Sequence, residues 1–158
     1  MNATLQQLYQ DIVLEHHAHP RHTGPLAAAT HQARVDNPLC GDRVTLQLRV
    51  EGDRIAEARF EGDGCAISIA SASLLTTMVA ARTLDEARAL DAELRRLLSR
   101  GADHEQADRN RLGDLVALEG TRLFPSRIQC ATLAWDAFAS ALLGTRPEGM
   151  KRHLSAQR

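Results

Sequence analysis

The chain lacks the features that mark membrane and secreted proteins. It has no apolar run of 18 residues, and its N-terminus is not a charged segment followed by an apolar one. Its formal net charge is only −1, so it has no general attraction to nucleic acid or to anionic membranes. We therefore expect a cytoplasmic protein whose partners include neither nucleic acid nor a membrane.

The sequence also has little cysteine. Three cysteines cannot all pair, and in a reducing compartment an odd number favours free thiols, a metal site or a reactive sulfur over disulfides. No C-x-x-C pair is present, so no familiar zinc template applies. The phosphate-loop patterns and the G-x-S-x-G elbow are missing too, which argues against a nucleotide site and against a hydrolase that uses Ser68, Ser71 or Ser73.

What is present predicts one small α+β domain. The length of 158 residues, with 44% hydrophobic and 25% charged side chains, is that of an ordinary globular protein. Apolar residues at helical spacing predict a first helix that ends before Pro20, and alternation over 43–60 predicts an antiparallel hairpin, with 33–36 as a third strand. Further helices are expected, and these cover 67–79, 84–98 and 125–144. The predicted fold is a short three-stranded antiparallel sheet covered by helices, and the charged stretch 102–111 is predicted to be an exposed connection.

Each cysteine lies where the backbone is expected to turn. Cys40 and Asp42 flank a glycine just before a strand, Cys65 follows a Gly-Asp-Gly turn that leads into a helix, and Cys130 lies in the first turns of the last helix. Three thiolates and one carboxylate suffice for a tetrahedral metal site. The alternative is that the thiols simply fill core space, although nearby Gly, Pro and Asp suit loops better than core interiors.

The segments around the cysteines resemble the signatures of a known family. They are Asn-Pro-x-Cys-Gly-Asp at 37–42, Gly-Asp-Gly-Cys-Ala-Ile-Ser-x-Ala-Ser-x-Ser at 62–73, and Pro-Ser-Arg-Ile-x-Cys-Ala-Thr-Leu-Ala-Trp at 125–135. In this order they are similar to those of the NifU N-terminal/IscU/SufU family of iron–sulfur assembly proteins. The resemblance implies a SufE/NifU-like fold in a domain over 1–145, followed by a polar tail at 146–158.

Within that family the chain resembles the SufU branch. Gln129 stands where scaffolds of the IscU branch typically carry a histidine before the third cysteine. The segment Leu-Phe-Pro-Ser-Arg at 123–127 does not reproduce their Leu-Pro-Pro-Val-Lys chaperone-binding motif. The stretch from about 83 to 120 resembles the longer insertion of SufU-type members.

The resemblance implies a zinc-dependent sulfurtransferase. It would accept persulfide sulfur from a SufS-type, pyridoxal-phosphate-dependent cysteine desulfurase and relay it to a downstream iron–sulfur scaffold. The implied zinc ligands are Cys40, Asp42, Cys65 and Cys130. Cys40 is also the implied sulfur acceptor, and Arg127 a supporting cation beside a site with a net charge of about −2.

Two other functions use the same ligands. One is a non-catalytic scaffold on which iron, as a [2Fe–2S] cluster, is assembled. The other is a zinc-stabilised module that only regulates the desulfurase. Gln129 favours the sulfurtransferase over the scaffold.

Four histidines, His16, His17, His19 and His22, lie close together near the end of the first predicted helix. A His-rich tract is a compositional hint of a second metal site. The alternative is a helix end, where cationic side chains interact favourably with the negative pole of the helix.

Overall fold

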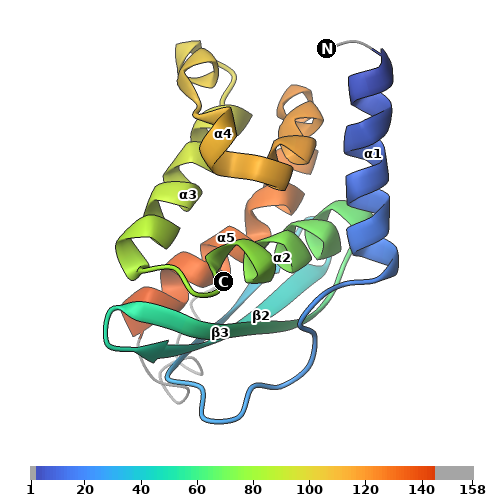
Figure 1. Ribbon diagram of the computed structural model, residues 1–158. Helices are drawn as coiled ribbons and strands as arrows, with labels where there is room; N and C mark the ends of the chain where they lie inside the picture. Colours follow the sequence, from blue (N-terminus) through green and yellow to red (C-terminus); the bar gives the residue numbers. More distant parts are fainter. Residues whose placement is uncertain (1–2, 145–158) are drawn as a thin grey trace.

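The computed structural model describes residues 3–144 and places helices over one face of a three-stranded sheet (Figure 1). In chain order the elements are α1 (Ala3–Ala18), β1 (His31–Asn37), β2 (Asp42–Glu51), β3 (Arg54–Asp63), α2 (Ala66–Val79), α3 (Leu84–Leu98), the 3₁₀ helix η1 (Ala102–Gln106), α4 (Arg109–Leu112), the 3₁₀ helix η2 (Gly113–Leu123) and α5 (Pro125–Gly144). The sheet order is β1-β2-β3, and both pairings are antiparallel. The predicted α+β architecture is therefore confirmed.

The central strand β2 shows why the hairpin could be predicted. Val44, Leu46 and Leu48 are fully buried and alternate with side chains on the other face, as the period of two in a strand requires. Leu46 lies opposite Ala33 of β1 and Phe60 of β3, and this row runs across the buried face of the sheet. The sheet therefore has a single apolar face, which the helices cover.

Two helices cover that face. α5 packs on β1 and β2, and α2 packs on β3 and against α5, while α1 lies beside α2 and η2. Trp135 and Phe138 of α5 are buried, as predicted, and meet edge to face with ring centroids 6.0 Å apart. The Ser71 hydroxyl of α2 donates a 2.6 Å hydrogen bond to the Ala131 carbonyl of α5. This contact joins the two helices that carry Cys65 and Cys130.

The segment 102–111 differs from its prediction. It is mostly exposed, as expected, but it is not a plain connection, because it folds into η1 and the start of α4. Asp108 caps α4 by accepting the Arg111 N–H, and Glu93 accepts the Asp108 N–H. Local hydrogen bonds of this kind stabilise short helical turns without any apolar stripe that a periodicity search could detect.

The structure also shows where the predicted capping box, insertion and tail lie. Thr83 and Glu86 form the expected capping box at the start of α3. The predicted insertion, 83–120, contains α3, η1, α4 and most of η2. The predicted tail, 146–158, lies outside the described residues. Within residues 3–144, no helix combines the length and the apolar character that a bilayer crossing requires.

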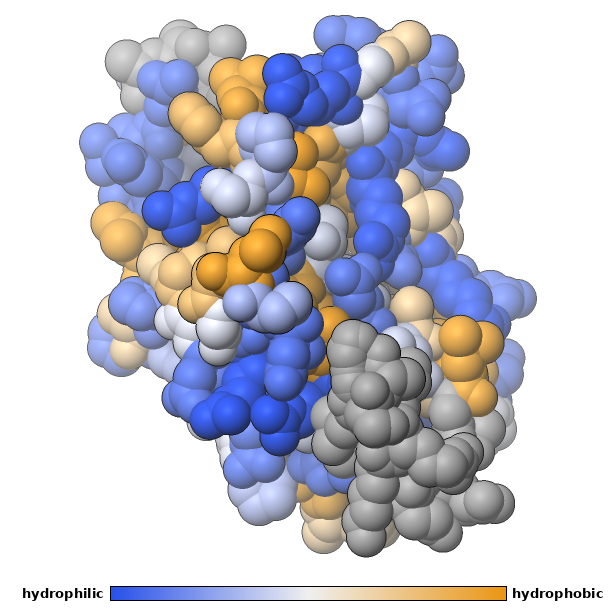
Figure 2. All heavy atoms as spheres, turned by 180° about the vertical axis from the view of Figure 1, so that it is seen from behind, coloured by the Kyte–Doolittle hydropathy of each residue, from blue (hydrophilic) through white to orange (hydrophobic). Residues whose placement is uncertain are grey.

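The surface mixes hydrophilic side chains with separate apolar patches, as the rear view shows (Figure 2). Several large apolar side chains are exposed in the described part of the chain, namely Leu8, Leu14, Leu39, Leu123, Phe124 and Leu143. Leu39 directly precedes Cys40, and Leu123 and Phe124 directly precede α5. Some of this apolar surface is therefore close in sequence to the predicted ligands.

Two of the four clustered histidines form hydrogen bonds that join the end of α1 and the following loop to α2. His16 is buried, with Nδ1 2.7 Å from the Ser73 hydroxyl, and His22 Nδ1 lies 3.1 Å from the Thr76 hydroxyl. Burial and then the positive charge of Arg21 lower the pKa of His16, although Asp114 and Glu15 act in the opposite direction. The neutral imidazole is thus the form that the fold favours.

We predict that His16 makes the fold sensitive to mild acid. Its pKa is lowered in the folded state from an ordinary value of 6.5, so the unfolded chain binds the proton more readily. The free energy of unfolding should therefore fall as the pH drops below about 6.5. His16→Asn cannot titrate and should lose less stability between about pH 7.5 and about pH 5.5, measured by chemical denaturation.

The control is His17→Asn, an exposed histidine on the same helix. It should keep the pH dependence of the wild-type protein. Equal pH dependence of all three proteins would show that His16 does not contribute.

Candidate metal centre

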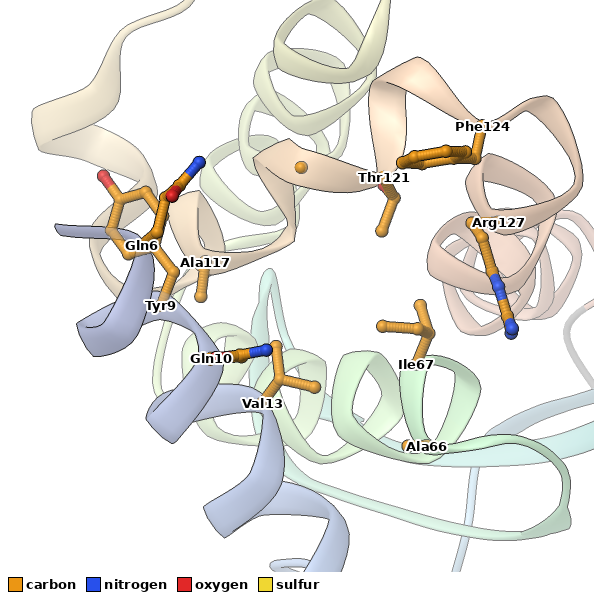
Figure 3. Close-up of a pocket in the computed structure, with 11 residues that line it drawn as sticks. Gln6, Tyr9, Gln10, Val13, Ala66, Ile67, Ala117, Thr121, Phe124 and Arg127 are labelled. Atoms are coloured by element: carbon orange, nitrogen blue, oxygen red, sulfur yellow. The ribbon is translucent and has the colours of Figure 1, made fainter. Parts of the chain in front are cut away.

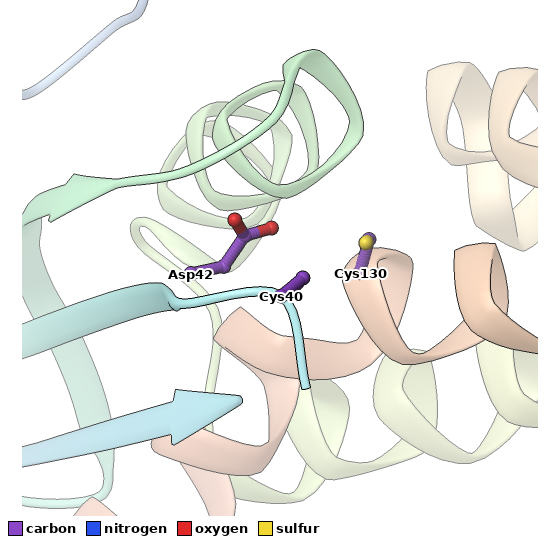
Figure 4. Close-up of side chains that lie close together, drawn as sticks. All are labelled: Cys40, Asp42 and Cys130. Carbon is purple, nitrogen blue, oxygen red and sulfur yellow. The ribbon is translucent and has the colours of Figure 1, made fainter. Parts of the chain in front are cut away.

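Cys40, Asp42 and Cys130 meet at one end of the sheet (Figure 4). Cys40 lies in the turn between β1 and β2, Asp42 is the first residue of β2, and Cys130 lies in the second turn of α5. One sulfur or carboxylate oxygen of each lies within 4.8 Å of the others. Residues far apart in sequence come together because α5 packs on β1 and β2.

The fourth predicted ligand, Cys65, lies beside this group but outside the 4.8 Å set. It is the N-cap residue of α2, where its side chain makes no capping hydrogen bond. Its sulfur lies 3.7 Å from the Ser68 hydroxyl, which donates a hydrogen bond to Asp42. The structure thus brings three predicted ligands together and places the fourth next to a residue that contacts one of them.

Asn37 shapes the turn that carries Cys40. Its side-chain oxygen accepts the Leu39 N–H at 3.0 Å, and its backbone carbonyl accepts the Gly41 N–H at 2.8 Å. Gly41 has φ +79°, a conformation that glycine adopts without a steric penalty. The Asn37 amide also donates to the Gln129 side chain at 3.4 Å, so the turn is linked to α5 next to Cys130.

The Asp42 carboxylate is buried but stays readily ionised. Burial raises its pKa, but hydrogen bonds from the Ser68 hydroxyl and the Cys65 backbone N–H outweigh that effect, so the pKa lies below its usual range. Position 64 accommodates this close approach only as glycine, because a Cβ there would lie 2.9 Å from Asp42 Cγ. The buried carboxylate is therefore a preformed oxygen donor.

The cysteines differ in their surroundings. Cys40 is exposed, whereas Cys130 is only 4% exposed. Burial, together with the hydrogen bond to Cys65, raises the pKa of Cys130 to about 12, so without a cation this side chain is a neutral thiol. A divalent cation deprotonates a coordinating thiol. Thiolates with one carboxylate are donors that zinc and iron both accept, so the residues present fit a metal ion.

A pocket of about 580 Å³ lies between α1, α2, η2 and the start of α5 (Figure 3). Val13, Ile67 and Phe124 are among its apolar lining residues, and Ala66 in its wall directly follows Cys65. Among the lining residues that the structure describes, Arg127 carries the charge, and it lies one helical turn before Cys130. Arg127 therefore lines the pocket and is close to Cys130 along α5.

Residues 8–131, most of the sequence, match the family described as the NifU-like N-terminal domain. The chain belongs to this family. The resemblance seen in the cysteine signatures is thereby confirmed.

Relatives in the NifU-like family include a protein named as a sulfurtransferase and proteins named as scaffolds. The chain is 38% identical to the zinc-dependent sulfurtransferase SufU of Bacillus subtilis, over 86% of this chain and 90% of that protein. It is 36% identical to the iron–sulfur cluster assembly scaffold protein IscU of Streptococcus pyogenes, over 87% of this chain and 84% of that protein. Both comparisons cover most of each chain.

Solved structures support the same fold. The crystal structure of the N-terminal part of a NifU-like protein from Brucella abortus superposes with a TM-score of 0.77 at 25% identity, covering 95% of this chain and 99% of that one. FiSufU of Fervidobacterium islandicum superposes with a TM-score of 0.78 at 26% identity, covering 89% and 99% of the two chains. The predicted SufE/NifU-like fold is therefore confirmed.

The histidine tract does not form a second metal site. Within residues 3–144, the group at Cys40 is the one set of three or more potential ligands at coordinating distances. His16 and His22 bind hydroxyls of α2, and His19 Nδ1 lies 3.5 Å from Glu15 Oε1.

Ser68 belongs to the site but was not predicted from the sequence. Its hydroxyl lies beside Asp42 and Cys65. Its position three residues after Cys65, at the start of a predicted helix, could have suggested this.

We predict that Asn37→Ala loosens the turn around Cys40. The Leu39 amide loses its acceptor, which corresponds to about 1 kcal/mol, and its hydrogen exchange should become roughly fivefold faster. Amide exchange measured by NMR or mass spectrometry tests this. Asp36→Ala, an exposed change one residue earlier, is the control and should leave Leu39 exchange unchanged. Unaltered exchange in Asn37→Ala would contradict the role of Asn37.

Proposed function

We propose that the protein is a zinc-dependent sulfurtransferase. It accepts persulfide sulfur from a SufS-type, pyridoxal-phosphate-dependent cysteine desulfurase and relays it to an iron–sulfur scaffold in the cytoplasm. The observation that carries the proposal is the composition of the cysteine group, in which one exposed thiol, Cys40, lies against the buried donors Asp42 and Cys130. The similarity to a relative named as a zinc-dependent sulfurtransferase supports it.

In this proposal Cys40, Asp42, Cys65 and Cys130 hold the zinc ion. Zinc, when bound, keeps the cysteines as thiolates at neutral pH. Asp42 supplies an oxygen that is already ionised, and burial shields Cys130 from solvent and from other reactants. The protein thus supplies both a stable ligand set and one sulfur that a partner can reach.

The transfer step uses the Cys40 thiolate as nucleophile. It attacks the outer sulfur of the donor's cysteine persulfide, so a sulfur–sulfur bond forms at Cys40 while the donor's sulfur–sulfur bond breaks. The donor cysteine leaves as a thiolate, and Cys40 becomes the persulfide, so no external oxidant or reductant is needed. Cys40 suits this role because its turn is exposed, whereas Cys130 is enclosed by α5 and its neighbours.

Arg127 has a supporting role in the proposal. Its charge partly offsets the net charge of about −2 on the ion and its four ligands. It also lies at the edge of the pocket between α1 and η2, beside exposed Phe124.

The second candidate is a scaffold that carries a [2Fe–2S] cluster on the same ligands as its cargo. The relative from Streptococcus pyogenes, named as a scaffold protein, favours it. Against it stands Gln129, which precedes Cys130 and accepts a hydrogen bond from Asn37. An amide in this position is a weaker cluster ligand than an imidazole, so we prefer the zinc enzyme.

We predict that Cys40→Ser abolishes the stimulation of the desulfurase. Alanine release from cysteine should fall to the rate of the desulfurase alone, because the hydroxyl is a poor acceptor for sulfane sulfur. Mass spectrometry of the wild-type protein after one turnover should find one extra sulfur atom on the peptide that contains Cys40. Arg127→Gln should weaken the stimulation without removing that persulfide.

Metal analysis of protein purified without oxygen separates the candidates. One zinc ion per chain supports the sulfurtransferase. A brown protein with stoichiometric iron and sulfide would favour the scaffold. Zinc with no persulfide on Cys40, or full stimulation by Cys40→Ser, would instead indicate a module that regulates the desulfurase.

A further inference from the structure

Ser68 touches two of the proposed ligands at once. It lies in the first turn of α2, three residues after Cys65, and its side chain is fully buried. Its hydroxyl donates a 2.6 Å hydrogen bond to Oδ2 of Asp42. The Ser68 Oγ atom also lies 3.7 Å from the Cys65 sulfur. A single hydroxyl thus joins the oxygen donor of the site to the start of α2.

This hydrogen bond restricts how the carboxylate can bind a cation. A free carboxylate can use either oxygen or both, and it can rotate about its side-chain bonds. In the structure Oδ2 accepts the Ser68 proton at 2.6 Å, so this oxygen is already engaged. Residues that hydrogen-bond ligating groups in this way commonly set both their orientation and the affinity of a metal site.

The packing around Ser68 holds this arrangement closely. A Cβ at position 64 would lie 2.9 Å from Asp42 Cγ and 3.1 Å from Ser68 Cβ. Gly64 therefore lets the strand that begins at Asp42 approach the first turn of α2 closely enough for the hydrogen bond. A side chain at position 64 would therefore press on both partners of the hydrogen bond.

We infer that Ser68 is a positioning residue of the metal centre, which orients Asp42 so that one carboxylate oxygen binds the ion and the other stays with the hydroxyl. The inference rests on the proposed metal site and deepens it. Asp42 is then a constrained ligand, held by a hydrogen bond from the first turn of α2. Cys40, by contrast, is exposed and lies in a turn.

The chain offers a matched control for Ser68. Ser71 lies one turn later in α2, is equally buried, and also donates a 2.6 Å hydrogen bond, but to the Ala131 carbonyl and not to a ligand. Ser68→Ala and Ser71→Ala therefore each remove one buried hydrogen bond of the same length from the same helix. Only the first change affects Asp42.

The test compares metal binding by the purified wild-type protein and the two variants. Zn²⁺ affinity is measured by competition with a chromophoric chelator, and Co²⁺ is added separately to record the visible ligand-field bands. We expect Ser68→Ala to bind Zn²⁺ about 10- to 100-fold more weakly and to shift the Co²⁺ bands. Ser71→Ala should match the wild type in both, even where thermal unfolding shows it to be less stable.

Gly64→Ala provides a second variant that keeps the hydroxyl but separates it from the carboxylate. It should reproduce the weaker binding and the shifted Co²⁺ bands of Ser68→Ala. Wild-type affinity and bands in Ser68→Ala would overturn the inference and leave the proposed site intact. Equal losses in Ser68→Ala and Ser71→Ala would also overturn it, because they would indicate a structural effect. A wild-type protein that binds neither ion would overturn the site and the inference together.

Discussion

The packing of α5 against β1 and β2 is the contact on which the site depends. No element of secondary structure contains the group by itself, since Cys40 and Asp42 come from the hairpin and Cys130 comes from the helix. Several of the buried residues of α5 are alanines, which allow a helix to lie close to its neighbours, and these are Ala131, Ala134, Ala137 and Ala141. The core therefore sets the distance between the halves of the site.

The proposed ligands also differ in how far they are exposed to solvent. Burial, the hydrogen bonds of Asp42 and the contacts at the start of α2 restrain three of the proposed ligands, whereas Cys40 lies in a solvent-exposed turn. A turn whose backbone is held by Asn37 can present its sulfur reproducibly without enclosing it. A reactive sulfur needs this combination, because it must be both accessible and held in place.

Local patterns explain what the sequence could predict. The strands and long helices follow from apolar periodicity, and the start of α3 follows from its capping box. The turn predicted at 62–64 was wrong in extent, because Gly62 and Asp63 still belong to β3. The cysteines could be recognised as a group only because their three signatures resemble a known family. Spacing alone left a buried-thiol alternative open.

The features that the sequence did not predict have a common physical cause. The turns within 102–111 arise from side-chain caps, and the roles of Ser68 and His16 arise from contacts with residues distant in sequence. A histidine count cannot distinguish a ligand from a neutral side chain that is hydrogen-bonded to a buried serine. Such contacts depend on how the helices pack, and no local sequence pattern predicts that packing.

Three buried serines of α2 each hydrogen-bond to a different part of the protein. Ser68 contacts Asp42, Ser71 contacts α5, and Ser73 contacts His16 and the Arg21 N–H. If α2 slid or rotated by one residue, these groups would lose their partners together, at about 1–3 kcal/mol for each buried group left unpaired. An apolar helix could slip between alternative packings, but this one has a single alignment that satisfies all three. The hydroxyls therefore favour one alignment of the helix, and of the three only Ser68 connects that alignment to a proposed ligand.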